Sequence, residues 1–300
     1  MVLPTYNCEE SIERTIGSVI GQTYNNIELI IVDDASQDNT VQIIKAYQKN
    51  DLRIKLIVLS KNRGPGHARN LGTRKATGKY LTFIDHDDYQ ENNRYENMIK
   101  LMKKDQSQVC FSMAKEINIV TNKSKLLNSN PLPEGPINIP RDLPCLAYKY
   151  IPPWRKVYLL SFVRTKELVF AEGETKFDDV LFHSLLMLSL GSASMYPHCC
   201  YTHVRTGISI SDTLSTDKKL RNDHAYSFSE CLLHPIVKKK GRRHATKYYY
   251  KLLRRHLNHI DQKIYPLAYK VLMKHHRMIV VKEGIIRRVE SFGLLKNRLK

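Results

Sequence analysis

A regular alternation of short apolar runs and helical periods occupies the first 105 residues of this 300-residue chain. Apolar runs rich in β-branched residues stand at 27–32, 54–59 and 80–84, and such near-continuous apolarity is typical of parallel strands buried on both faces. Helical spacing of apolar residues lies between them, at about 12–20, 41–47 and 66–76. Strand and helix repeated at this length predict βαβ units, and therefore an α/β fold with a mostly parallel sheet flanked by helices.

Capping residues mark the starts of two of these helices. Asn7 is a candidate N-cap for the first helix, with Glu10 at the capping-box position, and Asp38 is expected to open the second. Only three residues precede Pro4, so either the first strand is short or the true start of the protein lies upstream.

Polar side chains follow every predicted strand. The first strand ends in Pro4–Asn7, the second in Asp33 and Asp34, and the last in the run Asp85–Asp88. Ligands of open parallel sheets bind outside the carboxyl ends of the strands. Carboxylates that meet at one edge repel each other unless a cation lies among them. Hard oxygen ligands select Mg²⁺ or Mn²⁺, ions that share their coordination with substrate phosphates.

An isolated Asp-x-Asp pattern is weak, because it also fits a polar turn that caps the next helix. The position of Asp85 and Asp87 after a buried strand, with Asp33 and Asp34 one strand earlier, favours the metal and phosphate interpretation.

The motifs taken together resemble the nucleotide-sugar half of family 2 glycosyltransferases, in order, spacing and strand placement over about residues 1–105. The segments that carry this resemblance are Pro4–Asn7, Val32–Thr40, Asn62-x-Gly64, Ala68–Gly72, Ala76-x-Gly78 and Phe83–Asp88. Weaker similarity continues in Pro153–Tyr158, in Phe177–Phe182, where Asp178 replaces the usual Glu, and in the segment from Tyr201 to Ser209. The resemblance implies a GT-A fold and an inverting transfer from a nucleotide sugar.

The resemblance also implies a division of the chain. Residues 1–105 would form the nucleotide-sugar-binding half, 106–216 the acceptor-binding half, and 217–300 a basic helical C-terminal extension that matches no feature of the family.

Site residues follow from the same resemblance, position by position. Donor contacts fall on Pro4, Thr5, Tyr6, Asp33, Asp34, Arg69 and Asp85. The resemblance implies that Asp87, assisted by Asp85, binds the metal ion, Mn²⁺ or Mg²⁺, and that His203 completes the coordination shell of this ion. Local alternatives stay open: an Asx turn at Asp34, a solvated helix face at Arg69, and a structural role for His203, as is usual for a lone histidine on a strand.

Catalysis of proton removal is assigned to Asp179, at the start of an apolar helix where partial burial raises a carboxyl pKa. Its neighbour Asp178 belongs to the same motif, and either residue also fits a helix N-cap. Trp154 is the sole tryptophan of the chain and a candidate platform for the acceptor sugar, although a lone tryptophan is more often part of the core.

The charge of the chain is uneven. The net charge is +19, and residues 217–300 hold 22 Lys and Arg against 6 Asp and Glu, which gives +16. A basic end predicts an anionic surface as partner. No apolar run is long enough for a transmembrane helix, no signal peptide is expected, and six cysteines without CxxC spacing fit a reduced compartment.

These features predict a cytoplasmic enzyme, peripheral on the inner face of a membrane, that builds surface polysaccharide or glycolipid. A UDP-sugar is the expected donor, and a glycan or lipid-linked sugar the acceptor. The alternative is a nucleotidyltransferase or nucleic-acid-binding enzyme that uses the Asp cluster and the basic end. The sequence contains no nucleic-acid-binding motif, which makes nucleic acid the less favoured partner. For the basic end itself, the alternative is a packed helical subdomain whose charge is merely solvated.

Overall fold

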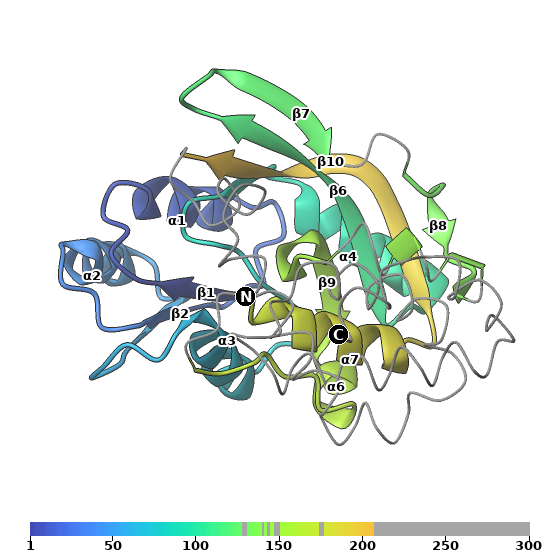
Figure 1. Cartoon of the computed structure of the whole chain (residues 1–300), viewed down its shortest axis with the longest axis horizontal. Helices are drawn as coiled ribbons and strands as arrows, with labels where there is room; N and C mark the ends of the chain where they lie inside the picture. The colour runs from blue at the N-terminus through green and yellow to red at the C-terminus, as the bar shows by residue number, and fades with distance from the viewer. Residues whose placement is uncertain (128–130, 140, 143–144, 147–150, 174–176, 207–300) are drawn as a thin grey trace, which may run out of the picture. The chain divides into compact units, whose positions relative to one another are not determined.

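In the computed structural model, the described residues are 1–127, 131–139, 141–142, 145–146, 151–173 and 177–206 (Figure 1). The chain divides into two compact units, Met1–Thr213 and Leu214–Lys300. All described residues belong to the first unit. The predicted basic helical region at 217–300 therefore lies outside the described residues, as do Ser209 and the residues after Thr206.

The N-terminal strands form a three-stranded parallel sheet in the order β1-β2-β3. Its strands are β1 (Val2–Thr5), β2 (Leu29–Asp33) and β3 (Ile54–Val58). The helices that alternate with them are α1 (Ile12–Ile20), α2 (Thr40–Asn50) and α3 (Pro65–Lys75). Thr5 pairs with Asp33, and Asp33 pairs with Val58, so all three strands end at the same edge.

A second sheet continues from the first through an isolated bridge between Val2 and Phe83. Its strand order is β4-β9-β6-β10-β5, with β7 on β6 and β8 on β10. Its strands are β4 (Tyr80–Thr82), β5 (Tyr89–Gln90), β6 (Val109–Asn118), β7 (Lys123–Leu127), β8 (Gly135–Pro136), β9 (Lys156–Leu159) and β10 (Ala193–Arg205).

The α/β fold is confirmed, and its parallel character is divided between the two sheets. Every pair in the N-terminal sheet is parallel. In the second sheet β6 and β10 are parallel, whereas their other pairings are antiparallel. The remaining helical elements are α4 (Arg94–Asp105), η1 (Pro153–Arg155), α6 (Leu160–Thr165) and α7 (Asp179–Ser189).

Helix α1 buries the predicted apolar stripe, because Ile12, Ile16 and Val19 are fully inaccessible to solvent. The predicted cap at Asn7 is wrong, since the N-cap position is Ser11. Asn7 instead has a left-handed φ of 45°, and its side-chain oxygen accepts a hydrogen bond from Gln37 N at 2.8 Å. The prediction for Asp38 holds in substance, because its Oδ1 accepts from Thr40 N at 3.0 Å although Asn39 is the N-cap residue.

Two glycines let α3 approach its neighbours closely. A Cβ on Gly72 would lie 2.4 Å from Val2 Cγ1, and one on Gly66 would lie 1.9 Å from the carbonyl oxygen of Ala171. Any side chain at these positions would force α3 away from β1 and from the segment that precedes α7. This packing brings the middle of α3 to the carboxyl edge of the strands.

Among the described residues, we find no helix with the length and apolarity needed to cross a membrane.

Candidate active site

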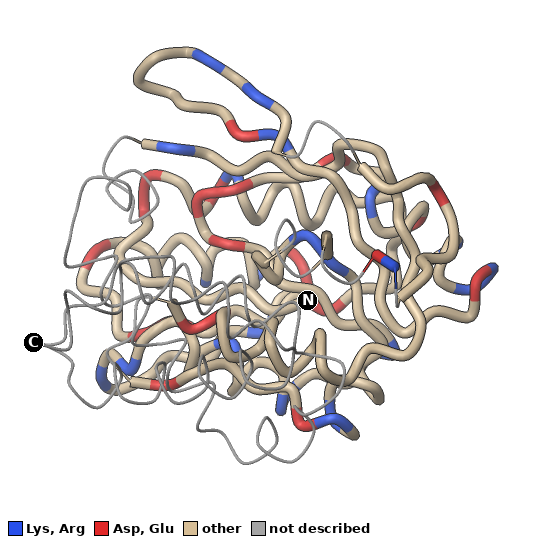
Figure 2. Tube along the Cα trace, turned by 45° about the vertical axis from the view of Figure 1, so that its right-hand side comes forward, with Lys and Arg blue, Asp and Glu red and all other residues tan. Residues whose placement is uncertain are grey.

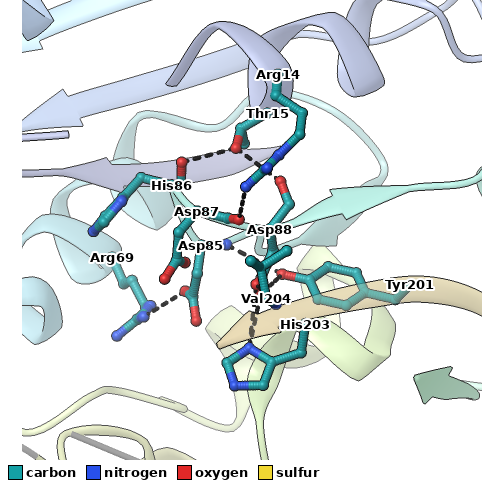
Figure 3. Close-up of polar contacts among 10 residues, drawn as sticks. All are labelled: Arg14, Thr15, Arg69, Asp85, His86, Asp87, Asp88, Tyr201, His203 and Val204. Carbon is teal, nitrogen blue, oxygen red and sulfur yellow. Dashed lines mark hydrogen bonds and ion pairs between the residues drawn. The ribbon is translucent and has the colours of Figure 1, made fainter. Parts of the chain in front are cut away.

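The run Asp85–Asp88 forms a loop after β4, and α1 holds the backbone of this loop in place (Figure 3). The hydroxyl of Thr15 lies 2.8 Å from the carbonyl oxygen of His86 and 2.7 Å from that of Asp88. Arg14 donates to the carbonyl oxygen of Asp87 at 2.6 Å. These contacts occupy backbone oxygens, so the carboxylates of Asp85 and Asp87 remain available to the site.

Asp88 fastens the same loop to β10. Its carboxylate is fully buried and accepts hydrogen bonds from Tyr201 Oη at 2.6 Å, from His203 Nδ1 at 3.1 Å and from Val204 N at 2.9 Å. Burial raises the pKa of Asp88 to about 6. Burial lowers the pKa of His203, but the Asp88 carboxylate outweighs it and raises that pKa to about 9. At neutral pH the two groups therefore form an ion pair.

Arg69 connects this loop to the start of α7. Its guanidinium donates to Asp85 Oδ1 at 2.7 Å and to Asp178 Oδ2 at 2.5 Å, and the side chain is buried. Burial opposes the charge of Arg69, but Asp178 and Asp85 raise its pKa well above the ordinary value. The alternative of a solvated helix-face arginine is therefore wrong.

Asp178 and Asp179 take different parts at this helix start. Asp178 occupies the N-cap position of α7 without a side-chain capping bond, since its carboxylate faces Arg69 instead; the capping interpretation is wrong for this side chain. Asp179 is partly buried in the first turn. Burial, and then the charge of Asp178, raise the pKa of Asp179 to about 6. A carboxyl that titrates near neutrality is suited to accept a proton.

The predicted donor residues at the ends of β1 and β2 brace the neighbouring loops. Asp33 is buried and accepts from Thr5 Oγ1 at 3.0 Å and from Ser36 N at 3.0 Å. Asp34 accepts from the backbone nitrogens of Arg63 and Gly64, both at 2.7 Å. Asp34 thus fixes a distant loop rather than an Asx turn of its own.

The other two predicted donor residues lie on either side of Thr5. Pro4 is buried within β1, whereas Tyr6 exposes its side chain just beyond the strand.

Trp154 lies in the core beside β10. Its ring is 4% exposed and stacks on Tyr201, with centroids 4.3 Å apart and planes inclined by 6°. His203 packs near the same indole at 5.6 Å. The structure gives Trp154 a packing role that supports Tyr201 and His203, and a ring this buried does not favour the predicted stacking on an acceptor sugar.

The metal residues predicted from the sequence come together only in part. Asp85 and Asp87 share one loop, whereas His203 directs Nδ1 to Asp88. A protonated imidazole has no free lone pair, so the ion pair competes with metal binding at His203. In the part of the chain that the structure describes, no three His, Cys, Asp or Glu side chains are grouped so as to hold a metal.

Sequence reasoning missed Thr15 and Tyr201, which hold the loop from opposite sides. A signal existed for both. Thr15 is a polar residue in the buried stripe of α1, and a buried hydroxyl needs a partner. Tyr201 lies two residues before His203 on one strand, so both side chains share a face.

Comparison with known proteins agrees with this arrangement. Residues 1–156, just over half of the chain, match the sequence profile described as Glycosyl transferase family 2. An uncharacterized glycosyltransferase of Haemophilus influenzae is 35% identical over 133 residues, which are 42% of this chain and 53% of that protein. The UDP-Glc:alpha-D-GlcNAc-diphosphoundecaprenol beta-1,3-glucosyltransferase WfgD of Escherichia coli is 36% identical over 118 residues, 39% of this chain and 46% of that protein. The matched segment thus spans about half the length of these relatives.

Solved structures share the fold at low identity. The Staphylococcus aureus protein TarS, residues 1–349 with UDP-GlcNAc, superposes with a TM-score of 0.61 and 18% identity over 94% of this chain and 91% of that one. The mannosyltransferase PcManGT of Pyrobaculum calidifontis, solved with GDP-Man and Mn²⁺, superposes with a TM-score of 0.55 and 16% identity. This match covers 98% of this chain and 79% of that one. These likenesses support the GT-A type of fold, and the profile match over residues 1–156 places the chain in glycosyl transferase family 2.

Proposed function

We propose that this protein transfers a sugar from a nucleotide-sugar donor to an acceptor hydroxyl, with inversion at the anomeric carbon. The observation that carries the proposal is the bridge from Asp85 through Arg69 to Asp178. It joins the acidic loop suited to a diphosphate and its metal to the helix start that bears Asp179. A leaving diphosphate and a base for the acceptor are the two needs of this reaction, and the bridge brings their residues to one place.

A divalent cation fits the residues of the acidic loop. Asp85 uses Oδ1 for Arg69, and among the described residues neither its second oxygen nor the Asp87 carboxylate has a hydrogen-bonding partner. Mg²⁺ and Mn²⁺ take hard oxygen ligands and complete their shells with substrate phosphates and water. Asp87, with Asp85, would hold such an ion, which when bound would neutralise charge on the leaving diphosphate.

Asp179 is the proposed general base. Its carboxylate accepts the proton of the acceptor hydroxyl while that oxygen bonds to the anomeric carbon and the bond from this carbon to the diphosphate breaks. Asp178 is held by its hydrogen-bonded contact with Arg69, and its charge contributes, after burial, to raising the pKa of Asp179 to about 6. We assign the base to Asp179 rather than to Asp178 because the Asp178 carboxylate is already engaged by the Arg69 guanidinium.

For the substrates, we propose a UDP-sugar and a lipid-linked or glycan acceptor. TarS was solved with UDP-GlcNAc, and the name of WfgD describes a UDP-Glc donor and a diphosphoundecaprenol acceptor. Tyr6 is exposed beside Thr5 at the end of β1, where a base could pack. The acceptor class and the +16 charge of residues 217–300 support work at the cytoplasmic face of an anionic membrane.

The test is a screen of nucleotide sugars against lipid-linked acceptors, in which released nucleoside diphosphate is measured with Mn²⁺ and Mg²⁺. Release with one UDP-sugar that depends on acceptor supports the proposal. Transfer of a nucleotidyl group instead of a sugar contradicts the proposal, and so does the absence of transfer from every donor.

A further inference from the structure

The hairpin of β6 and β7 carries apolar side chains at an exposed tip. Its turn, residues 119–122, begins with Ile119, which is 55% exposed, and Val120, which is 70% exposed. Turns are usually built from Gly, Asn, Asp, Ser and Pro. Two adjacent β-branched apolar side chains that stay exposed to water among the described residues are unfavourable, which suggests that another apolar phase covers them.

The hairpin carries a third exposed apolar side chain, away from its turn. Leu126 on β7 is also exposed, and it pairs with Lys115 across the hairpin. Figure 1 shows the hairpin projecting from the rest of the described chain. The outer edge of β7 pairs with no strand of the described residues.

The tip lies at the same edge as the candidate active site. Strands β6 and β10 are parallel, with His203 opposite Glu116 and Arg205 opposite Asn118. His203 contacts the acidic loop through Asp88, and the hairpin turn follows Asn118 directly. A surface that receives Ile119 and Val120 would therefore meet the edge of the protein at which donor and acceptor are proposed to bind.

Lysines lie along both strands of the hairpin that carries this apolar tip (Figure 2). Residues 115–127 contain three lysines and one glutamate, and Figure 2 shows basic residues along both strands of the hairpin. Lys125 pairs with Glu116 at 2.9 Å, whereas Lys123 is exposed near the turn. Apolar side chains flanked by lysines match the interface of an anionic bilayer, in which the apolar atoms enter the acyl region and the ammonium groups stay among the phosphates.

We propose that the β6–β7 hairpin is a membrane-contact element, which inserts Ile119 and Val120 into an anionic lipid surface and turns the active-site edge toward it. This contact goes beyond the proposed transfer reaction and can be measured on vesicles that contain no acceptor. It also differs from an electrostatic attraction by residues 217–300, because apolar insertion persists when salt screens charge.

Vesicle sedimentation of the full chain tests the contact. The double variant Ile119→Asp with Val120→Asp is compared with Leu52→Asp, which changes a side chain 93% exposed in the turn before β3, at the opposite edge of the parallel strands. On phosphatidylglycerol vesicles in 0.5 M salt, we expect the double variant to bind about tenfold or more weakly than wild type, and Leu52→Asp to bind as wild type. Equal binding by all three proteins, or no binding by wild type, would overturn the proposal.

Insertion is measured separately by fluorescence. Trp154 is buried and gives a constant background, so Val120→Trp and Leu52→Trp each add one reporting indole. The Val120→Trp emission should shift to the blue on phosphatidylglycerol vesicles and be quenched by brominated acyl chains, whereas Leu52→Trp should not respond. A blue shift that grows with protein concentration in the absence of lipid would assign the tip to self-association and refute the membrane contact. Circular dichroism and melting curves confirm that each variant is folded.

Discussion

Carboxylates at the two edges of the parallel strands have pKa values shifted in opposite directions. At the amino-terminal edge, Glu28 precedes β2 and accepts four hydrogen bonds: from Lys55 Nζ at 2.6 Å, from Thr77 N at 2.6 Å, from Thr77 Oγ1 at 3.0 Å and from Gly78 N at 2.9 Å. Burial works to raise its pKa, but Lys55, Thr77 and Gly78 together lower it to about 2. At the carboxyl-terminal edge, burial and Asp178 raise the pKa of Asp179 to about 6.

The difference separates a carboxylate that holds the fold from one that is available for chemistry. Glu28 is ionised at every physiological pH, and its carboxylate oxygens accept hydrogen bonds from donors of the protein itself. Asp179 is kept in a state that costs folding energy, since its ionised form is disfavoured where it lies. An ionised carboxylate that is disfavoured at one edge and a fully hydrogen-bonded one at the other form the pattern expected when function opposes stability. Amide substitutions at both edges test this comparison.

The largest effect is expected for Asp87→Ala. The Asp87 carboxylate has no hydrogen-bonding partner among the described residues, so the free energy of unfolding should change by less than about 0.5 kcal/mol. Transfer supported by Mn²⁺ should fall to background, because the proposed principal ligand of the ion is gone. Nucleoside diphosphate release is measured against Mn²⁺ concentration, with the exposed residue Glu13 changed to Ala as control. Full activity of wild type in excess EDTA would refute the metal role.

Asp179→Asn is expected to lower turnover by on the order of 10²–10⁴, the range for loss of a general base, with donor binding unchanged by calorimetry. Wild-type turnover should fall as pH drops below about 6, where Asp179 becomes protonated. The folded pKa lies above the ordinary value, so protonation stabilises the folded state, and the uncharged amide should raise the melting temperature at pH 7.

Asp178→Asn is the matched control for this base assignment. It removes the ion pair with Arg69 and should lower the melting temperature. A dead Asp178→Asn enzyme beside an active Asp179→Asn enzyme would reverse the assignment within the pair.

Asp88 lies at the functional edge but is partnered like Glu28, and it therefore sharpens the comparison. Asp88→Ala leaves the Tyr201 hydroxyl and the His203 imidazole without their shared acceptor. Loss of one member of a buried ion pair costs about 3–5 kcal/mol, measured by urea unfolding. Asp88→Asn keeps one acceptor oxygen, which can serve either Tyr201 Oη or Val204 N but not both, and it should recover part of this loss. If the unfolding curves of both variants overlay that of wild type, Asp88 has no structural role and belongs with Asp87.

The strands and helices of the first 105 residues were predictable because their periodicity is local. The strand ends also indicated that Asp33, Asp34, Asp85 and Asp87 share an edge, since parallel strands end together, whereas Arg69 was placed at the site only by the family resemblance. The sequence could not show that Arg69 bridges Asp85 and Asp178, because that contact joins residues 109 positions apart.

Two residue roles were left open by the sequence and are decided by packing that no local pattern reveals. For Trp154 the alternatives were a sugar platform and a core position, and its ring lies against Tyr201. For Asp178 the alternatives were a part in the catalytic motif and a helix cap, and its carboxylate pairs with Arg69 instead of capping α7. In both cases a partner from a distant segment decides between two interpretations that the sequence allows equally.

Glu28→Gln tests the amino-terminal edge and should give the smallest effect. The folded pKa of Glu28, about 2, lies below the ordinary value of 4.5, so its charge stabilises the fold above pH 4.5 and this contribution is lost as pH falls toward 2. A shift of this size corresponds to about 3 kcal/mol at neutral pH. Urea unfolding should therefore separate the variant from wild type at pH 7, and the difference should shrink as the pH is lowered toward 2, with transfer activity at pH 7 unchanged. A variant as stable as wild type at pH 7 would mean that Thr77 and Gly78 donate equally well to an amide oxygen. The contrast between the two edges would then rest on geometry rather than on charge.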